Sequence, residues 1–404
     1  MALNGVLVYN QFMKTDLAAL KQSVKDSVGR QAAALSKIAL DIHDNPELGF
    51  HEKQAAVWLT DHLKKNGFTV EMGIADLPTA WRATYGSGKP VIALVGEYDA
   101  LPEVGHACGH NLIATASIGA AVASKALADK FGGTIQMIGT PAEELYGGKI
   151  PMVKKGIFNG LDAAMMVHPG TESTAITRAL AVVTLYVEYF GREAHAAAHP
   201  EQGINALDAI IIGYNGVAAL RQHIPLSARI HGIITDGGKA ANVVPGHSAG
   251  NFLVRAMDLK YLEELKEKVL NCFRSGALAT GAELSYHWDE HAYEPLKANI
   301  ELAKLFATNI RNLGRDIKLD DTSHAFGSTD MGNVSQVAPS LHGFLAIAPK
   351  GVSGHTKEFA IYAGSEEGLK GMLDAATGLA LTAADLFANP ATLANVKAEF
   401  EKSA

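Results

Sequence analysis

Three short apolar runs in the first half of the chain each end in polar or turn residues. They are VIALVGEYDALP, TIQMIGTPAEE and DAAMMVHPG, which begin at residues 91, 134 and 162. Continuous apolar runs of this length are typical of strands that are buried on both faces of a parallel sheet, with helices covering those faces. The pattern predicts an α/β domain with a mixed, largely parallel sheet and helices on both faces.

From about residue 179 the pattern changes to alternation. The segment AVVTLYVEYF places Val183, Leu185 and Val187 on one side of a strand and more polar residues on the other. The segments that follow indicate a helix, two strands, a second helix and a last strand, which is the element order of the ferredoxin-like unit. We therefore expect a ferredoxin-like α+β domain at residues 179–293. It would interrupt a domain made of residues 1–178 and 294–404.

The composition excludes several classes of protein. Of 404 residues, 48% are hydrophobic and 19% are charged, a balance typical of folded globular chains. The formal net charge of −7, without a cluster of Lys and Arg, argues against nucleic acid as a partner. The first residues lack the pattern of a signal peptide, and no apolar run of about 18 residues is uninterrupted. We expect a cytoplasmic protein that acts on a small molecule and has no membrane partner.

We expect four side chains suited to chemistry to fall just past the ends of the predicted strands. Asp99 follows the first run, Glu143 and Glu144 follow the second, and His168 lies at the end of the third. In open α/β sheets, ligand sites gather beyond the carboxyl ends of the strands. Three segments that are far apart in the chain therefore predict a single site.

The two cysteines have different settings. Cys272 lies in a helical pattern, in step with apolar residues, and we expect it to be ordinary core. Cys108 lies between two histidines, His106 and His110, in GHACGHN. A disulfide is not expected for two cysteines in a cytosolic chain, so a metal ligand and a nucleophile remain as interpretations of Cys108. We interpret His106 as a structural histidine.

The adjacent glutamates Glu143 and Glu144 favour the metal interpretation. Neighbouring carboxylates at a buried edge repel each other and are costly to desolvate unless a cation lies beside them. A thiol nucleophile needs no such pair, whereas a hydrolytic metal site needs an anionic ligand and a base for its water. Considered alone, the pair is more often a surface feature, and a lone histidine is more often structural. Five residues together form a set suited to zinc, manganese or cobalt: Cys108, His110, Glu144, His168 and His355.

Several segments jointly resemble a known family. They are EYDALPEVGHACGHNLIA, TPAEE, AHAAAHPEQGINALDA, ANVVPG, LVRA and STDMGNVS, in that order along the chain. Together they resemble the M20 family of metallopeptidases and amidohydrolases, in the cysteine-bearing branch of the aminobenzoyl-glutamate hydrolases and Xaa-Arg dipeptidases. The resemblance spans about residues 40–360 and so covers both predicted domains.

The resemblance implies a centre of two divalent metal ions, with zinc, manganese or cobalt as the candidates. Glu143 would be the general base, and Asp99 would orient the site. In the wider family a histidine stands at the position of Glu97 and an aspartate bridges the metals. Here Cys108 would take over part of that role. The implied ligands are Cys108, His110, Glu144, His168 and His355.

The resemblance also implies roles for the inserted domain, as a lid and as a dimerisation domain. His195 matches a histidine that family members lend to the active site of the neighbouring subunit, which implies a homodimer. Asn242 and Arg255 match groups that hold the carbonyl and the carboxylate of the substrate. Without the resemblance, His195 would be interpreted as a surface histidine and Arg255 as a salt-bridged strand residue.

The function implied is hydrolysis of an amide bond next to a free carboxylate. The substrate would be a dipeptide or an N-acyl or aminobenzoyl amino acid, and these residues do not distinguish among them, because the chemistry is the same. The alternative is a non-catalytic protein of the same fold that binds a small peptide or a pterin-like ligand.

Overall fold

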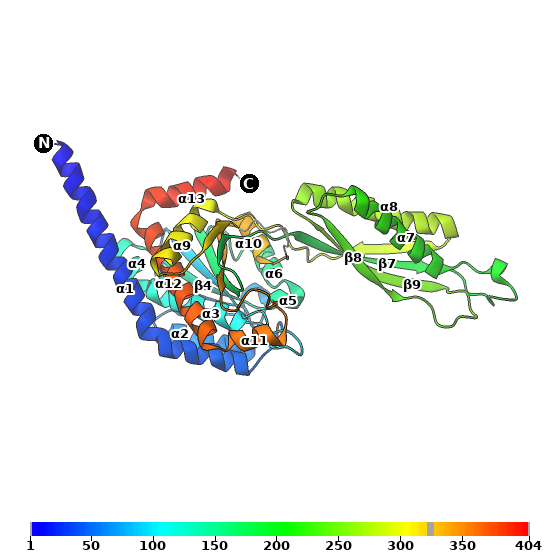
Figure 1. The fold of residues 1–404 in the computed structure, drawn as a ribbon, viewed down its shortest axis with the longest axis horizontal. Helices are drawn as coiled ribbons and strands as arrows, with labels where there is room; N and C mark the ends of the chain where they lie inside the picture. Colours follow the sequence, from blue (N-terminus) through cyan, green and yellow to red (C-terminus); the bar gives the residue numbers. More distant parts are fainter. Residues whose placement is uncertain (1, 321–326, 403–404) are drawn as a thin grey trace. The chain divides into compact units, whose positions relative to one another are not determined.

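The computed structural model describes residues 2–320 and 327–402, with side chains from residue 17 onward. Among these residues the chain divides into two compact units, coloured along the sequence in Figure 1. Unit 1 comprises residues up to 178 together with the described parts of 297–322 and 333–404. Unit 2 comprises 179–296 and the described part of 323–332.

Unit 1 contains an eight-stranded sheet. Its central strands β4, β3, β5 and β12 run parallel to one another, whereas the β1–β2, β2–β4 and β12–β6 pairs are antiparallel. The predicted α/β class with a mixed, largely parallel sheet is therefore confirmed. The strand order is β1 (Thr69–Met72), β2 (Trp81–Ser87), β4 (Gly133–Thr140), β3 (Val91–Glu97), β5 (Ala163–Gly170), β12 (Ser340–Ala346), β6 (Thr174–Ile176) and β11 (Lys318–Asp320).

The core of unit 1 lies between this sheet and a layer of helices. Helix α3 contacts β3, β4 and β5, and α12 contacts α1, α3 and α9. Small residues allow this close approach: a Cβ at Gly119 of α3 would lie 2.6 Å from the Leu35 side chain. The helices are α1 (Ala2–Asp44), α2 (Lys53–Lys65), α3 (His110–Ala123), α4 (Lys125–Phe131), α5 (Glu143–Tyr146), α6 (Lys149–Lys154), α9 (Ile300–Asn312), α11 (Lys357–Ala363), α12 (Glu366–Ala388) and α13 (Pro390–Lys402), with α10 (Met331–Val337) at the unit boundary and a 3-10 turn η1 (Ile74–Asp76).

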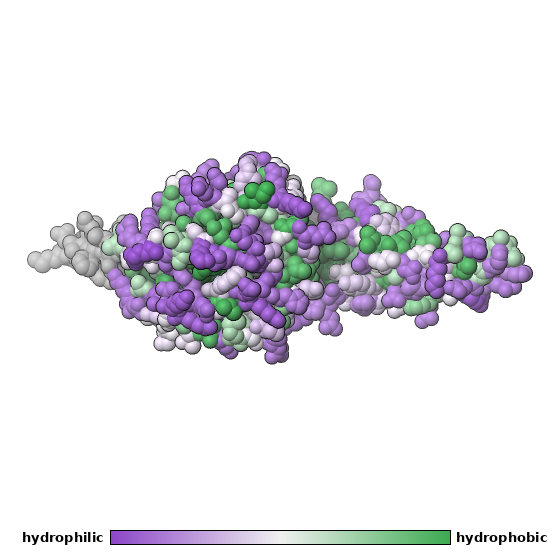
Figure 2. All heavy atoms as spheres, turned by 90° about the horizontal axis from the view of Figure 1, so that it is seen from below, coloured by the Kyte–Doolittle hydropathy of each residue, from purple (hydrophilic) through white to green (hydrophobic). Residues whose placement is uncertain are grey.

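One helical stretch among the described residues, His110–Phe131, is long and apolar enough to cross a membrane by length and composition, with a mean hydropathy of 1.3. However, 89% of that window is buried inside the protein, as in the core helix of a globular domain. The visible face of unit 1 in Figure 2 is mostly hydrophilic, in keeping with an apolar interior.

Unit 2 has the predicted ferredoxin-like topology. Its sheet is antiparallel throughout, in the order β10-β7-β9-β8, and α7 and α8 pack against each other and against β7 and β9. Asn205 and Asp258 cap the two helices by accepting backbone N–H groups of the first turn. The elements are β7 (Ala181–Phe190), α7 (Ala206–Leu220), β8 (Arg229–Asp236), β9 (His247–Ala256), α8 (Leu259–Thr280) and β10 (Glu283–Trp288), with 3-10 turns η2 (Pro200–Gln202) and η3 (Arg221–His223).

Candidate metal centre

The ends of neighbouring strands in unit 1 carry the candidate residues to one edge of the sheet. Strand β3 ends at Glu97, two residues before Asp99, and β4 ends shortly before α5, which begins at Glu143. His168 lies inside β5, not just past its end. Cys108 lies in the turn before α3, whose first residue is His110. The convergence follows from the parallel β3–β4 and β3–β5 pairs.

The five predicted metal ligands come together in overlapping groups. The sulfur of Cys108 lies 3.3 Å from Nε2 of His168. Cys108, His110 and His168 each offer a ligand atom within 4.8 Å of the others, and Cys108, Glu144 and His355 do the same. Cys108 is thus shared by both groups. Both cysteines are free, so a disulfide is not the role of Cys108.

Asp99 connects two of these ligands. Its Oδ1 accepts a hydrogen bond from Nδ1 of His110 at 3.0 Å, and its Oδ2 accepts the backbone N–H of Glu144 at 3.0 Å. Burial raises the pKa of Asp99, but the charge and hydrogen bond of His110 outweigh it, so the pKa is lowered. Asp99 therefore contacts two predicted ligands, and the orienting role that the resemblance implies for it stays a prediction.

Both histidines of the first group turn a free nitrogen toward Cys108 and Glu144. Nδ1 of His168 donates to the carbonyl oxygen of Pro169 at 2.6 Å, and Nδ1 of His110 donates to a carboxylate. Because Nδ1 of each ring is taken up by an acceptor, Nε2 is the atom through which each ring could bind a metal ion.

Two buried atoms of this cluster have no hydrogen-bond partner: Nε2 of His110 and Oε1 of Glu144. They lie 3.9 Å apart. Burial lowers the pKa of His110, but the Asp99 carboxylate outweighs it and the pKa is raised, so without a metal ion a proton on Nε2 faces the neighbouring carboxylates. A divalent cation that displaced this proton would be held by both atoms. The residues present therefore fit a divalent metal ion, with sulfur, nitrogen and oxygen donors suited to zinc and similar ions.

The ionisation of the ligands also fits a metal site. Burial lowers the pKa of His168 to about 3, which keeps its ring neutral. Burial raises the pKa of the Cys108 thiol, so that the chain alone holds it protonated. A metal ion would have to displace that proton, which couples metal affinity to pH.

His355 reaches the site from a loop. Its backbone has φ 62°, which is uncommon for a residue other than glycine, and its N–H donates to the carbonyl oxygen of Ala107 at 2.9 Å. Its side chain is 58% exposed, and its Nε2 lies 3.5 Å from Oε2 of Glu144. It is therefore the solvent-facing member of the ligand set.

Glu143 lies close to the ligands, and so does Glu97, which the sequence analysis did not count as a site residue. Glu143 offers a carboxylate oxygen within 4.8 Å of ligand atoms of His110 and Glu144, and another such group joins it to Glu97. Oε2 of Glu97 lies 3.5 Å from Nε2 of His110.

Glu97 also forms a fully buried ion pair, its Oε1 lying 2.5 Å from Nζ of Lys149. Burial raises the pKa of Glu97, but Lys149 and His110 outweigh it, and the pKa falls to about 2. In the sequence, Glu97 is distinguished as a charged residue at the end of an apolar strand, but nothing indicates that Lys149 is its partner.

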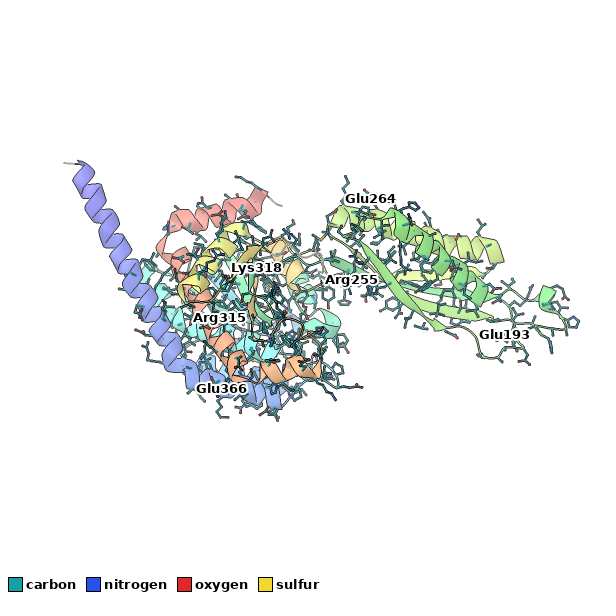
Figure 3. The ribbon with its side chains drawn as sticks, in the orientation of Figure 1. Glu193, Arg255, Glu264, Arg315, Lys318 and Glu366 are labelled. Atoms are coloured by element: carbon teal, nitrogen blue, oxygen red, sulfur yellow. The ribbon has the colours of Figure 1, made fainter. Side chains whose placement is uncertain are left out.

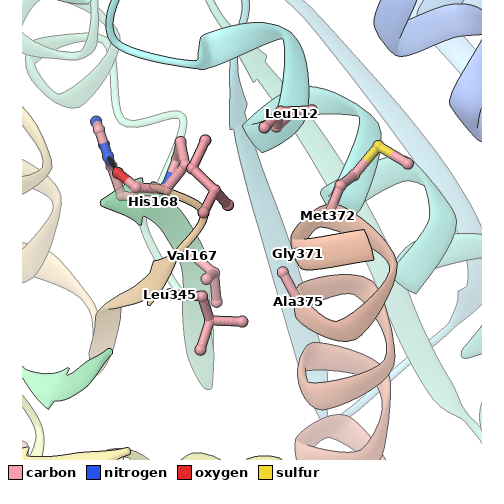
Figure 4. A pocket seen from close by; sticks show the side chains of 9 residues that line it. Leu112, Val167, His168, Leu345, Gly371, Met372 and Ala375 are labelled. Carbon is pink, nitrogen blue, oxygen red and sulfur yellow. Dashed lines mark hydrogen bonds between the residues drawn. The ribbon is translucent and has the colours of Figure 1, made fainter. Parts of the chain in front are cut away.

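A small apolar pocket lies behind His168 (Figure 4). Neither Glu143 nor Glu144 lines it, so it belongs to the packing that supports the His168 ring. On another side the ring stacks on Phe344, with centroids 4.7 Å apart. The lining residues are Leu112, Val167, His168, Pro169, Leu345, Ile347, Gly371, Met372 and Ala375.

The candidate substrate residues all lie in unit 2. His195 is exposed, and its Nδ1 accepts the N–H groups of Ala197 and Ala198, which leaves Nε2–H available as a donor. Asn242 is exposed and adjacent, since its backbone carbonyl accepts the N–H of Ala196 at 3.0 Å.

Arg255 lies elsewhere in unit 2. It pairs with Val182 near the start of β7, whereas His247 at the other end of β9 pairs with Phe190. At about 3.3 Å per residue, Arg255 and His247 are roughly 26 Å apart. His195 lies beyond His247, because it bridges Val243. Figure 3 labels Arg255 and Glu193, a neighbour of His195, at opposite ends of this sheet.

The Arg255 guanidinium donates to Oγ of Ser328 at 3.0 Å, but its buried Nε has no hydrogen-bond partner. Among the residues that the structure describes, Arg255 has no salt-bridge partner, in contrast to the salt-bridged strand residue expected without the resemblance. It retains donor capacity for an anion.

Comparisons with known proteins agree with this picture. A model of the family described as Peptidase family M20/M25/M40 matches residues 93–377. The Xaa-Arg dipeptidase of Mus musculus is 35% identical over 402 residues, covering 96% of this chain and 93% of that protein. One of the subunits of the p-aminobenzoyl-glutamate hydrolase of Escherichia coli is 35% identical over 288 residues, covering 66% of this chain and 60% of that protein.

The fold has solved counterparts. A dinuclear metal-binding peptidase of family M20 from Bacillus subtilis matches with a TM-score of 0.67 at 18% identity, covering 87% of this chain and 98% of that one. Because the family model matches more than half of the chain, and the mouse relative is similar along nearly its whole length, this chain is an enzyme that belongs to peptidase family M20/M25/M40.

Proposed function

We propose that the enzyme hydrolyses the amide bond of a dipeptide or of an N-acyl or aminobenzoyl amino acid, next to a free carboxylate, and that it depends on two divalent metal ions. The observation that carries this proposal is the pair of unpartnered buried atoms, Nε2 of His110 and Oε1 of Glu144, inside a set of five donors. The two groups that share Cys108 support two ions, as in the dinuclear relative from Bacillus subtilis.

Cys108, His110, Glu144, His168 and His355 would hold the ions, with zinc, manganese or cobalt as the candidates. When bound, the ions supply Lewis-acid polarisation of a carbonyl group and lower the pKa of water toward about 7. Glu143 would accept the proton of the attacking water and deliver it to the leaving amine. Asp99 would keep His110 and Glu144 in place through its two hydrogen bonds.

Arg255 would bind the free carboxylate, while His195 and Asn242 would bind the carbonyl oxygen. The roughly 26 Å that separate Arg255 from the His195 end of the sheet exceed the length of a dipeptide. We therefore infer a homodimer in which one subunit supplies Arg255 and the other supplies His195.

The proposal is tested with a substrate panel of Xaa-Arg and other dipeptides, N-acyl amino acids and aminobenzoyl-glutamate. Each substrate is incubated with the chelator-treated enzyme and with added manganese, zinc or cobalt, and the released amine is measured. We expect release that depends on the metal. Absence of release from every substrate of the panel would contradict the proposed substrate class.

A further inference from the structure

The residue before Glu143 has an unfavourable backbone conformation. Ala142 has φ 60° and ψ 41°, in the left-handed region, although it carries a Cβ and is fully buried. Such a conformation persists in a folded protein only where the surroundings hold it. Glu143 begins the short helix α5 directly after it, so the turn at Ala142 sets the direction in which Glu143 leaves the strand.

A buried carboxylate holds this turn. Oε1 of Glu52 accepts the backbone N–H of Ala142 at 2.8 Å, and Oε2 accepts the hydroxyl of Thr79 at 2.9 Å. Glu52 is 0% exposed, so these hydrogen bonds are not shared with solvent. Thr79 is held in turn, since its carbonyl oxygen accepts the hydroxyl of Tyr98 at 2.6 Å. Without the carboxylate, the N–H of Ala142 would be buried and unpaired.

The segment that carries Glu52 packs against both arms of the site. On one arm, Ala100, the neighbour of Asp99, donates its N–H to the carbonyl oxygen of Glu47 at 2.8 Å. On the other arm, a Cβ at Gly49 would lie 2.9 Å from Cβ of Ala142, so only glycine fits there. The ring of Phe50 stacks on Tyr146 of α5 with centroids 5.2 Å apart.

We propose that Glu52 is a positioning residue for Glu143: through the N–H of Ala142 it fixes the turn that places the Glu143 carboxylate beside His110 and Glu144. The inference rests on the proposed function of Glu143 as general base. The Glu52 carboxylate is fully buried and bonds to Ala142 and Thr79, not to the predicted ligands. Its effect therefore reaches the reaction only through the loop that it holds.

The first test is amide hydrogen exchange of the peptide that covers residues 137–148, measured on the full-length enzyme. Glu52→Ala should make the Ala142 amide exchange faster. Glu52→Gln should preserve protection, because its amide oxygen can still accept that N–H. Glu52→Asp keeps the charge but withdraws it by one methylene, and it should behave like Glu52→Ala. This measurement does not depend on activity, so it judges the positioning role even if the enzyme hydrolyses none of the substrates.

The second test is kinetic and uses a matched control. Glu399 also accepts two backbone N–H groups, those of Ile300 and Glu301, but it caps α9 and lies in α13. We expect Glu52→Ala to lower kcat by about 10- to 100-fold, since small displacements of a catalytic group have effects of this size. KM and the metal content should stay unchanged, Glu52→Gln should restore kcat to within a few-fold, and Glu399→Ala should leave it unaltered.

The outcomes separate the two proposals. An inactive wild-type enzyme with a protected Ala142 amide that Glu52→Ala exposes would contradict the proposed function and support the positioning role in the loop. Unchanged protection in both Glu52→Ala and Glu52→Asp, or equal loss of kcat in Glu52→Ala and Glu399→Ala, would overturn the positioning role. If Glu52→Ala does not fold, Glu52→Asp decides the question by the same criteria.

Discussion

The two units of this enzyme arrange their candidate chemical groups in opposite ways. In unit 1, ligand atoms from separate segments lie within 4.8 Å of one another, and His110 and its partner Asp99 are buried together. In unit 2, His195 and Arg255 lie at opposite ends of one antiparallel sheet. The ends of parallel strands bring groups to one edge, so a metal centre can be complete within one unit. Groups at the two ends of an antiparallel sheet serve two different places.

The largest expected effect comes from removing Glu143, the proposed base in unit 1. Glu143→Ala should lower kcat by about 1,000-fold or more while the metal content, measured by mass spectrometry after dialysis, stays that of the wild type. Cys108→Ser is the matched contrast, because an alcohol rarely loses its proton to become a ligand, and it should lose metal. If Glu143→Ala hydrolysed substrate at a substantial rate, the base would be another residue.

Removing the buried ammonium group of Lys149 should lower the stability of unit 1. Lys149→Met keeps the volume but leaves the Glu97 carboxylate buried without its partner, which should lower the free energy of unfolding by about 3–5 kcal/mol. Urea unfolding in a Trp288→Phe background follows unit 1 alone, through Trp58 and Trp81. The exposed pair of Lys64 and Asp61 gives the control, since Lys64→Met should change stability by less than about 1 kcal/mol.

Bound metal could reduce the loss of unfolding free energy in Lys149→Met. That result would sharpen the comparison, because a cation near Glu97 would then replace the missing ammonium. A stability equal to that of Lys64→Met would show that this buried pair contributes nothing to unit 1.

The sequence predicted those parts of unit 1 that depend on local pattern. The three apolar runs became β3, β4 and β5, and the polar residues that follow them meet because parallel pairing aligns the strand ends. The ferredoxin-like order of unit 2 was also visible, since the segment of β7 alternates and each helix begins at a capping residue. The break at Ser124 between α3 and α4 was not visible in the sequence.

Parts of the site that depend on tertiary contacts could not be predicted. A lysine after two glycines gives no sign that it is buried, because its partner Glu97 lies 52 residues away in the chain. Glu52 reaches Ala142 across 90 residues, and nothing in its own segment indicates a buried acceptor. The separation of His195 from Arg255 could be deduced only once the register of β7 and β9 was known.

Mixing two variants of unit 2 tests whether the His195 and Arg255 of one subunit serve different active sites. His195→Ala and Arg255→Ala should each lower kcat/KM by about 100-fold, as expected for lost carbonyl or carboxylate contacts. If each active site takes Arg255 from one subunit and His195 from the other, a randomly mixed dimer population should recover about one quarter of wild-type activity. Activity that stays at the level of the single variants after subunit exchange would mean that each active site takes both residues from the same subunit.

The smallest expected effect concerns pH, and its sign should differ between the units. Burial lowers the pKa of His342 in unit 1 to about 4, well below its ordinary 6.5. Between about pH 6.5 and 4, the unfolded chain therefore protonates His342 whereas the folded chain keeps it neutral. The stability that the neutral His342 contributes is lost as pH falls through this range. In unit 2, the hydrogen bond with Asp236 raises the pKa of His247, so its contribution is present at acid pH and is lost as pH rises through that raised value.

Acidification of the metal-depleted enzyme from pH 7 to 5 should therefore weaken unit 1 relative to unit 2. Unfolding followed by Trp288 in a Trp58→Phe, Trp81→Phe background reports unit 2, and the Trp288→Phe background reports unit 1. His342→Phe should remove about 1–2 kcal/mol of the acid destabilisation of unit 1, because it abolishes the titration while its backbone carbonyl still accepts the Thr177 hydroxyl. If the wild-type and His342→Phe enzymes had parallel profiles of stability against pH, the pKa of His342 would be the same in the folded and the unfolded chain. Burial in unit 1 would then oppose a charged histidine no more than the exposed sheet of unit 2 does.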